Sequence, residues 1–178
     1  RDFFLENIGV FLFGRETINQ LFFTRRIGLT EDGERVPLDY GVKLTGKLGP
    51  YNIGFLQVQQ RQLGNPAGIG IPRQQFTVAR VKRDILKRSY IGAMFVNREG
   101  GVTHAYNRGV GVDAEFNLTD YWQVKAFLMA TDTPGLTSNF LSGRIQATYE
   151  SDRYRLIALY GAKALKSVDS EVQDKIYR

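Results

Sequence analysis

Residues 107–132 alternate apolar side chains with small, polar or charged ones almost without interruption. Before Thr119 the apolar parity of "NRGVGVDAEFNLTDYWQVKAFLMATD" consists of Val110, Val112, Ala114, Phe116 and Leu118. Successive side chains of a β-strand point to opposite faces, so this stretch predicts a hairpin with one apolar and one polar face. A helix would need a period near 3.6 residues, which this pattern does not offer.

The alternation leaves two arrangements open. In a soluble sheet the apolar side packs into a protein core and the polar side meets water. In a membrane barrel the apolar side meets lipid and the polar side lines the lumen. Alternation alone does not distinguish the two arrangements.

The same period recurs along the chain and predicts an all-β, antiparallel, up-and-down meander of about nine strands. Residues 1–19 are expected to be a lead-in segment, 20–165 to hold the strands and 166–178 to form a tail. Nine is odd, whereas bacterial single-chain barrels have even counts, so we expect an open or incomplete sheet. The predicted strands are 20–28, 40–48, 51–60, 74–84, 88–98, 105–118, 121–131, 138–150 and 153–165.

The links between these strands alternate in length. Tight turns are expected at Gly49-Pro50, 85–87, Thr119-Asp120 and Ser151-Asp152, with longer links between them. In a meander this order places every tight turn at one end of the sheet and every long loop at the other. Transmembrane barrels have this asymmetry, which favours the membrane arrangement.

Composition excludes a helical membrane protein and leaves a barrel open. The chain has 178 residues, with 43% hydrophobic and 24% charged residues. No window approaches the roughly 18 consecutive apolar residues of a spanning helix, but a barrel strand needs only about 10. There is no cysteine, and the chain starts at Arg1 in mid-pattern, like a fragment or a processed piece of a longer protein.

Charged side chains recur on the polar parity of the strands, mixed with small residues, as a crowded and wet lumen would require. Two arginines, Arg83 and Arg108, fall on the apolar parity near strand ends, where we expect a membrane interface. A change of parity between Phe55 and Leu56 predicts a β-bulge. The lumen-facing candidates are Lys43, Arg80, Lys82, Asp113, Glu115, Lys125 and Arg144.

No motif predicts a catalytic residue, a metal site or a cofactor. His104 is the only histidine, and a metal or triad site needs several convergent groups. Asp113 and Glu115 share a strand face, which keeps a glycoside hydrolase as a third hypothesis, although such carboxylates usually flank a substrate from different strands. The chain has a net charge of +6, and its basic residues are most concentrated at 80–88. We interpret this run as a charged strand face and turn, not as a nucleic-acid site.

Several segments, in order along the chain, resemble a family of uncharacterised bacterial outer-membrane β-barrel domains. These domains usually follow a carbohydrate-binding module of the family-nine type. The departure from the family is the tail, "SVDSEVQDKIYR", where relatives tend to carry an Asn-Pro-Glu-Val-Gly-Phe-like stretch. The matching segments are "RDFFLEN" (1–7), "LFFTRRIG" (21–28), "GVKLTGKLGPYNIGFLQVQ" (41–59), "FTVARVKRDILKRSYIGAMFVNRE" (76–99), "YNRGVGVDAEF" (106–116) and "TDTPG" (131–135).

The resemblance implies an outer-membrane location, an upstream carbohydrate-binding module and contact with lipid, and it supplies no catalytic residues. Together with the loop pattern it predicts a barrel segment that acts as a pore or binding scaffold for a polar solute such as a saccharide. The alternative is a soluble periplasmic or extracellular barrel that binds a small ligand inside. In the first case Val110, Val112 and Phe116 face outward to lipid, and in the second they face inward.

Overall fold

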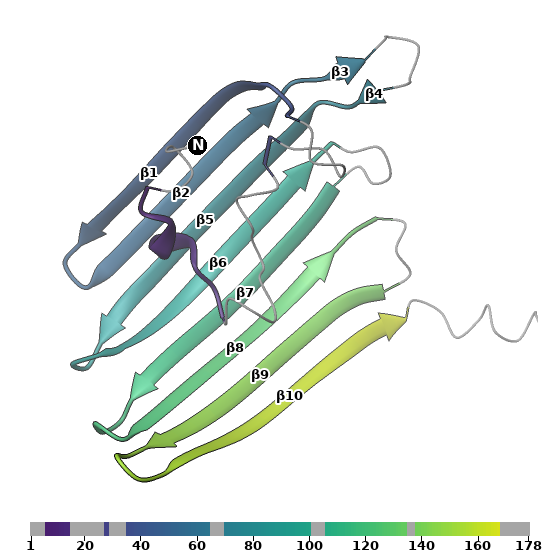
Figure 1. Ribbon diagram of the computed structural model, residues 1–178. Coiled ribbons are helices and arrows are strands. Elements are labelled where there is room, and N and C mark those ends of the chain that lie inside the picture. The colour runs from purple at the N-terminus through teal and green to yellow at the C-terminus, as the bar shows by residue number, and fades with distance from the viewer. Residues whose placement is uncertain are drawn as a thin grey trace, which may run out of the picture.

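The computed structural model describes residues 6–14, 27–28, 35–64, 70–100, 106–134 and 138–167. Most of them form one antiparallel, eight-stranded sheet with the order β1-β2-β5-β6-β7-β8-β9-β10 (Figure 1). A short 3-10 helix, η1 (Ile8–Phe11), precedes it. The strands are β1 (Leu38–Leu48), β2 (Tyr51–Gln60), β5 (Gln74–Ile85), β6 (Ser89–Glu99), β7 (Tyr106–Asn117), β8 (Trp122–Asp132), β9 (Ser138–Glu150) and β10 (Arg155–Ser167).

The all-β meander predicted from the sequence is confirmed for the eight strands. The sheet is open, because β1 and β10 lie at its two edges. A separate two-stranded hairpin, β3 (Leu63–Gly64) with β4 (Gly70–Ile71), lies in the link between β2 and β5. The ninth predicted strand, 20–28, falls mostly outside the described residues.

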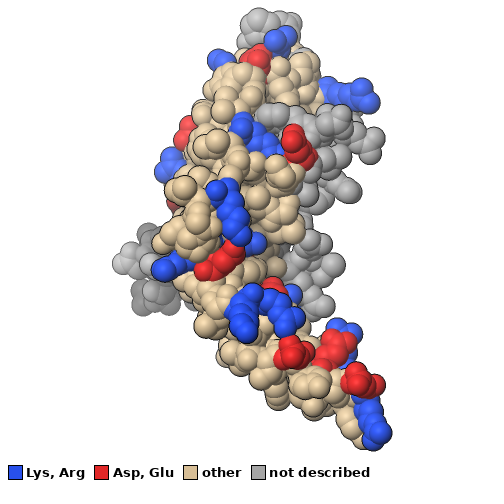
Figure 2. Space-filling model, turned by 90° about the vertical axis from the view of Figure 1, so that its left-hand side faces the viewer, with Lys and Arg blue, Asp and Glu red and all other residues tan. Residues whose placement is uncertain are grey.

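The four tight turns lie at one end of the sheet and the longer links at the other, as the alternation of link lengths predicts (Figure 1). Gly49, in the β1–β2 turn, has a φ of +58°, a conformation that glycine adopts without steric cost. Charged side chains of both signs gather along the end where the tight turns lie (Figure 2).

The bulge predicted between Phe55 and Leu56 is wrong. The pairing of β2 with both neighbours runs through these residues without a shift, and the irregularity in β1 lies at Leu38/Tyr40 instead. The parity changes because β2 is apolar on both faces. Leu56 and Val58 are buried on the opposite face of the sheet from Phe55.

The hydrophobic core lies on a single face of the sheet. Residues 6–14, which hold η1, cross this face in front of the strands (Figure 1). Phe11 and Phe13 are each 4% exposed there. We call the side that they cover the covered face and the opposite side the apolar face. Within the described residues, no helix has the length and apolar character needed to cross a membrane.

Candidate functional site: the covered face

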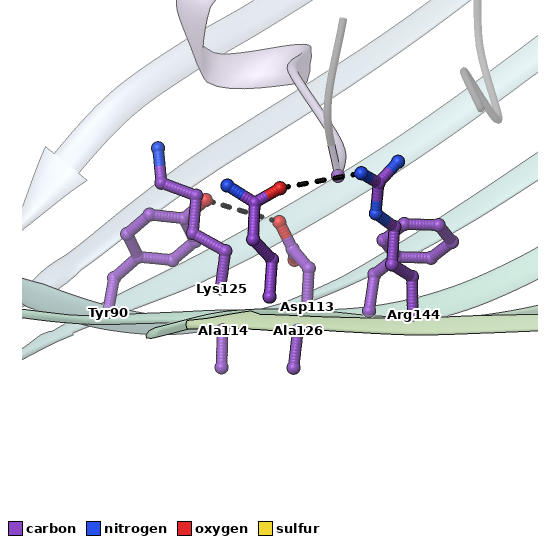
Figure 3. A pocket seen from close by; sticks show the side chains of 9 residues that line it. Tyr90, Asp113, Ala114, Lys125, Ala126 and Arg144 are labelled. Carbon is purple, nitrogen blue, oxygen red and sulfur yellow. Dashed lines mark hydrogen bonds between the residues drawn. The ribbon is translucent and has the colours of Figure 1, made fainter. Parts of the chain in front are cut away.

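The alternation of β7 and β8 separates two unlike surfaces. Tyr90, Asp113, Lys125 and Arg144 rise from the covered face, whereas Ala114 and its neighbours of the same parity point to the other side (Figure 3). Strand pairing carries this division across all eight strands. All seven lumen-facing candidates therefore share the covered face: Lys43, Arg80, Lys82, Asp113, Glu115, Lys125 and Arg144.

Two glycines on the covered face leave the room in which the N-terminal segment packs against the sheet. A β-carbon at Gly111 would lie 2.4 Å from Cζ of Phe13, and one at Gly54 would lie 2.8 Å from Cγ1 of Val10 and 2.9 Å from Cε1 of Phe11. Such approaches leave no room for a side chain on the strands. Glycine at these positions therefore allows the rings to pack against the sheet backbone.

Arg80 on β5 and Asp113 on β7 form an ion pair that crosses the intervening strand β6. The guanidinium meets the carboxylate at two points, Nη1–Oδ1 at 2.7 Å and Nη2–Oδ2 at 2.8 Å. Their side chains are 0% and 2% exposed. A β-carbon at Gly92, the residue of β6 opposite Asp113, would lie 2.8 Å from Arg80 Nη1 and 2.9 Å from Asp113 Oδ1. Gly92 leaves the space in which the two charges meet.

Phe13 joins the N-terminal segment to this ion pair. The Arg80 guanidinium carbon lies 5.5 Å from the centroid of the Phe13 ring, within the range of a cation–π contact. Phe13 also makes an edge-on contact with Phe127, with the two ring centroids 6.0 Å apart. The segment is therefore fixed by apolar packing and by the buried charge.

A second polar cluster lies next to the ion pair. The Tyr90 hydroxyl donates to Asp113 Oδ2 at 3.4 Å, and Lys82 Nζ lies 4.2 Å from the centroid of the Tyr90 ring. Glu115 accepts from Gln123 at 3.0 Å and pairs with Lys125 at 3.3 Å. Both carboxylates are thus held by cations of other strands, Asp113 by Arg80 two strands away and Glu115 by Lys125 of the adjacent strand β8.

The remaining candidates lie at the two sides of the cluster. Lys43 on β1 donates to the backbone carbonyl of Glu6, and its ammonium lies 6.0 Å from the centroid of the Phe11 ring. Arg144 on β9 donates to Gln146 Oε1 at 3.4 Å. It lines a small hollow, partly open to solvent, together with Tyr90, Asp113 and Lys125 (Figure 3).

The sequence did not predict the packing of the N-terminal segment against the glycines of the covered face. The sequence predicts only a lead-in segment for residues 1–19, and it does not predict that Phe11 and Phe13 pack on the polar parity of the strands. The available signal was the parity of the glycines, since Gly54, Gly92 and Gly111 all lie on the covered face. Glycine inside a strand often marks the close approach of another group.

The apolar face holds most of the exposed large apolar side chains of the described residues. Seventeen of its large apolar and aromatic side chains are more than a third exposed, and they come from all eight strands. Val110 and Val112 are 52% and 54% exposed. Contiguous surfaces of this kind mark contacts with a membrane or with another protein. The others are Tyr40, Val42, Leu44, Leu48, Tyr51, Ile53, Val81, Ile91, Phe95, Trp122, Leu128, Leu141, Ile145, Leu156 and Tyr160.

The two arginines of the apolar parity lie near strand ends, as predicted. Arg83 lies 5.5 Å from the centroid of the Tyr51 ring at the turn end of the sheet. Arg108 lies 4.4 Å from the centroid of the Tyr106 ring at the loop end and pairs with Glu99 at 3.6 Å. Each charge is therefore accompanied by an aromatic ring at the border of the apolar face.

Asp113 and Glu115 do not form the open pair of carboxylates that a glycoside hydrolase would need, because each is bound by its own cation. Among the described residues, no group of three or more side chains could hold a metal ion. His104 lies outside the described residues. Comparison of the chain with family models, with curated proteins and with solved structures gives no match.

Proposed function

We propose that the chain forms part of the wall of a β-barrel in a bacterial outer membrane. Its covered face would line a lumen that passes or holds a polar solute such as a saccharide. The observation that carries the proposal is the orientation of the two faces. The face with charged side chains is covered, and the face with apolar side chains is bare across all eight strands.

Strand length supports the same proposal. A strand of 11 residues, such as β6 or β8, is about 37 Å long at the usual rise. Tilted by about 35–45°, it would span about 26–30 Å along the membrane normal, enough for an apolar band of about 25 Å. Short turns at one end and longer links at the other are the usual arrangement of such barrels.

A barrel of this kind requires partners for both edges of the sheet. In the described chain β1 and β10 each pair with a single neighbour. Backbone groups at an open edge would be unsatisfied in lipid, so each edge must meet a further strand.

The N-terminal segment would lie inside this lumen. Residues 10–13 cover the middle of the face that would line the pore, and they rest on two glycines that admit no side chain. A segment placed in this way would narrow the passage, as the interior segments of plugged barrels do. We therefore propose a partly occupied lumen rather than a wide open channel.

The alternative, a soluble barrel with a small ligand inside, requires the face of Val110 and Val112 to be turned inward. Their exposure, together with the burial of Asp113 on the other face at 5%, supports the membrane proposal over this alternative. A carbohydrate solute and an upstream carbohydrate-binding module are proposed from the family resemblance.

The test is to express the full chain in a bacterium, extract it from the membrane fraction and assay its migration and conductance. We expect extraction to need detergent, the migration on gels to change on heating, and single-channel currents to appear in planar bilayers. A protein that remains in the aqueous phase without detergent would contradict the proposal. The soluble alternative predicts that outcome.

A further inference from the structure

We infer that the covered face selects anionic solutes, and this inference rests on the proposed function because it names the solute class of the same lumen. The face has far more basic than acidic side chains. Register and alternation place nine described Lys and Arg side chains on it against four Asp and Glu side chains. The excess of positive charge is therefore five.

Every acid of the covered face is already bound by a cation of that face. Asp113 and Glu115 form the ion pairs with Arg80 and Lys125 described above. The other two acids lie nearer the turns, where Asp84 pairs with Lys47 at 3.0 Å and Glu150 pairs with Arg155 at 3.7 Å. No carboxylate on the strands of this face is left to attract a cationic solute.

Besides Lys43, which donates to the backbone carbonyl of Glu6, four cations of the face form no salt bridge with a carboxylate of the described residues, although Asp113, Asp84 and Glu115 still attract the charge of Lys82. Lys82 and Lys163 lie against the aromatic rings of Tyr90 and Phe140, with the Lys163 ammonium 5.8 Å from the ring centroid. Within the part of the chain that the structure describes, Arg144 donates to the amide oxygen of Gln146 and to no carboxylate. The fourth is Arg98, which lies on β6.

These cations are distributed across the face from β5 to β10 rather than gathered in one pocket. A lumen lined with fixed positive charge lowers the energy of an anion along its path and raises that of a cation. The distribution therefore predicts charge selectivity along a passage rather than tight binding of an anion at a single site. A solute that carries a carboxylate, such as an acidic saccharide, has the chemistry that this surface accepts.

The apolar face contrasts with this pattern. Its charged side chains include Arg83, Arg108, Glu99 and Asp132, which balance one another and lie toward strand ends. The positive excess is therefore a property of the covered face and not of the strands in general.

The first test is the reversal potential of the full chain in planar bilayers under a gradient of KCl. We expect the sign that indicates preference for chloride. In the variant Lys82→Gln/Arg144→Gln the reversal potential should shift toward zero. Arg88→Gln removes a charge from a turn, where Arg88 pairs with Asp120, and should leave the reversal potential unchanged. A wild-type preference for potassium, or a shift equal in the double variant and the control, would overturn the inference.

A second test does not depend on a pore. Calorimetric titration of the detergent-solubilised protein with sodium glucuronate or with glucose compares an anionic with a neutral sugar of similar size. We expect heat of binding from glucuronate only, and its loss in Lys82→Gln/Arg144→Gln. Equal heats for the two sugars would overturn the inference even if the protein conducts. Binding of glucuronate by a protein that never conducts would support the charge selectivity while contradicting the pore.

Discussion

Arg80 and Asp113 are joined by a buried two-point ion pair across strand β6, with nitrogen–oxygen distances of 2.7 and 2.8 Å. Strands β5 and β7 lie about 9.6 Å apart, which is twice the usual distance between neighbouring strands. Only long side chains with no third side chain between them can meet across that distance. Gly92 provides that opening. The pair thereby joins three consecutive strands and supports the ring of Phe13 above them.

Removing one charge of this pair is expected to destabilise the protein strongly. Asp113→Ala leaves the buried guanidinium of Arg80 uncompensated, at a cost of about 3–5 kcal/mol. Arg80→Met/Asp113→Leu removes both charges and should recover most of that loss. The measurement is the free energy of unfolding in guanidinium chloride, with the protein in detergent micelles.

The control for this prediction is Lys47→Ala, which breaks the pair of Lys47 with Asp84. Those side chains are 63% and 41% exposed, so the loss should stay below about 1 kcal/mol. An Asp113→Ala variant no less stable than this control would show that the buried pair is not part of the folded protein.

A side chain at Gly111 is expected to release the N-terminal segment. In Gly111→Ala the new methyl group would overlap the ring of Phe13, so residues 10–13 should exchange their amide hydrogens faster. Gly46→Ala is the matched control on β1, since a β-carbon there would meet nothing within 4 Å. Equal exchange in the two variants would mean that the glycine does not hold the segment.

Truncation of a single ring is expected to widen the passage. Phe13 is 4% exposed and packs on the covered face, whereas its neighbour Leu12 is 37% exposed. Phe13→Ala should therefore raise the single-channel conductance, and Leu12→Ala should change it little. If both variants conduct like the wild type, the segment does not narrow the lumen.

A charge in the middle of the apolar face should distinguish lipid from water. Val112→Arg is expected to cost about 2–4 kcal/mol if the residue faces the bilayer midplane. The measure is the fraction of protein that reaches the heat-modifiable folded form in lipid vesicles. Thr119→Arg, in an exposed turn, is the control. Equal folding of the two variants would be the result for a side chain that faces water.

Much of the fold follows from the sequence, because period two is a local property that the backbone imposes. The eight strands and the shared face of Arg80 and Asp113 could be predicted from parity alone. Their pairing could not, because it depends on which strands become neighbours. The bulge predicted at Phe55/Leu56 is wrong. Apolar side chains are favourable on the covered face because Phe11 and Phe13 bury them, and parity alone does not show that this segment lies there.

The measurement that tests the central claim most directly uses the only tryptophan of the chain. Trp122 begins β8 at the turn end of the apolar face, is 44% exposed, and lies 5.1 Å from Tyr149 between ring centroids. If this face meets lipid, Trp122 lies at a membrane interface. In vesicles its fluorescence should be quenched by lipids brominated near the headgroup, and less by lipids brominated near the chain ends. Quenching by aqueous iodide with no effect of either brominated lipid would contradict the claim.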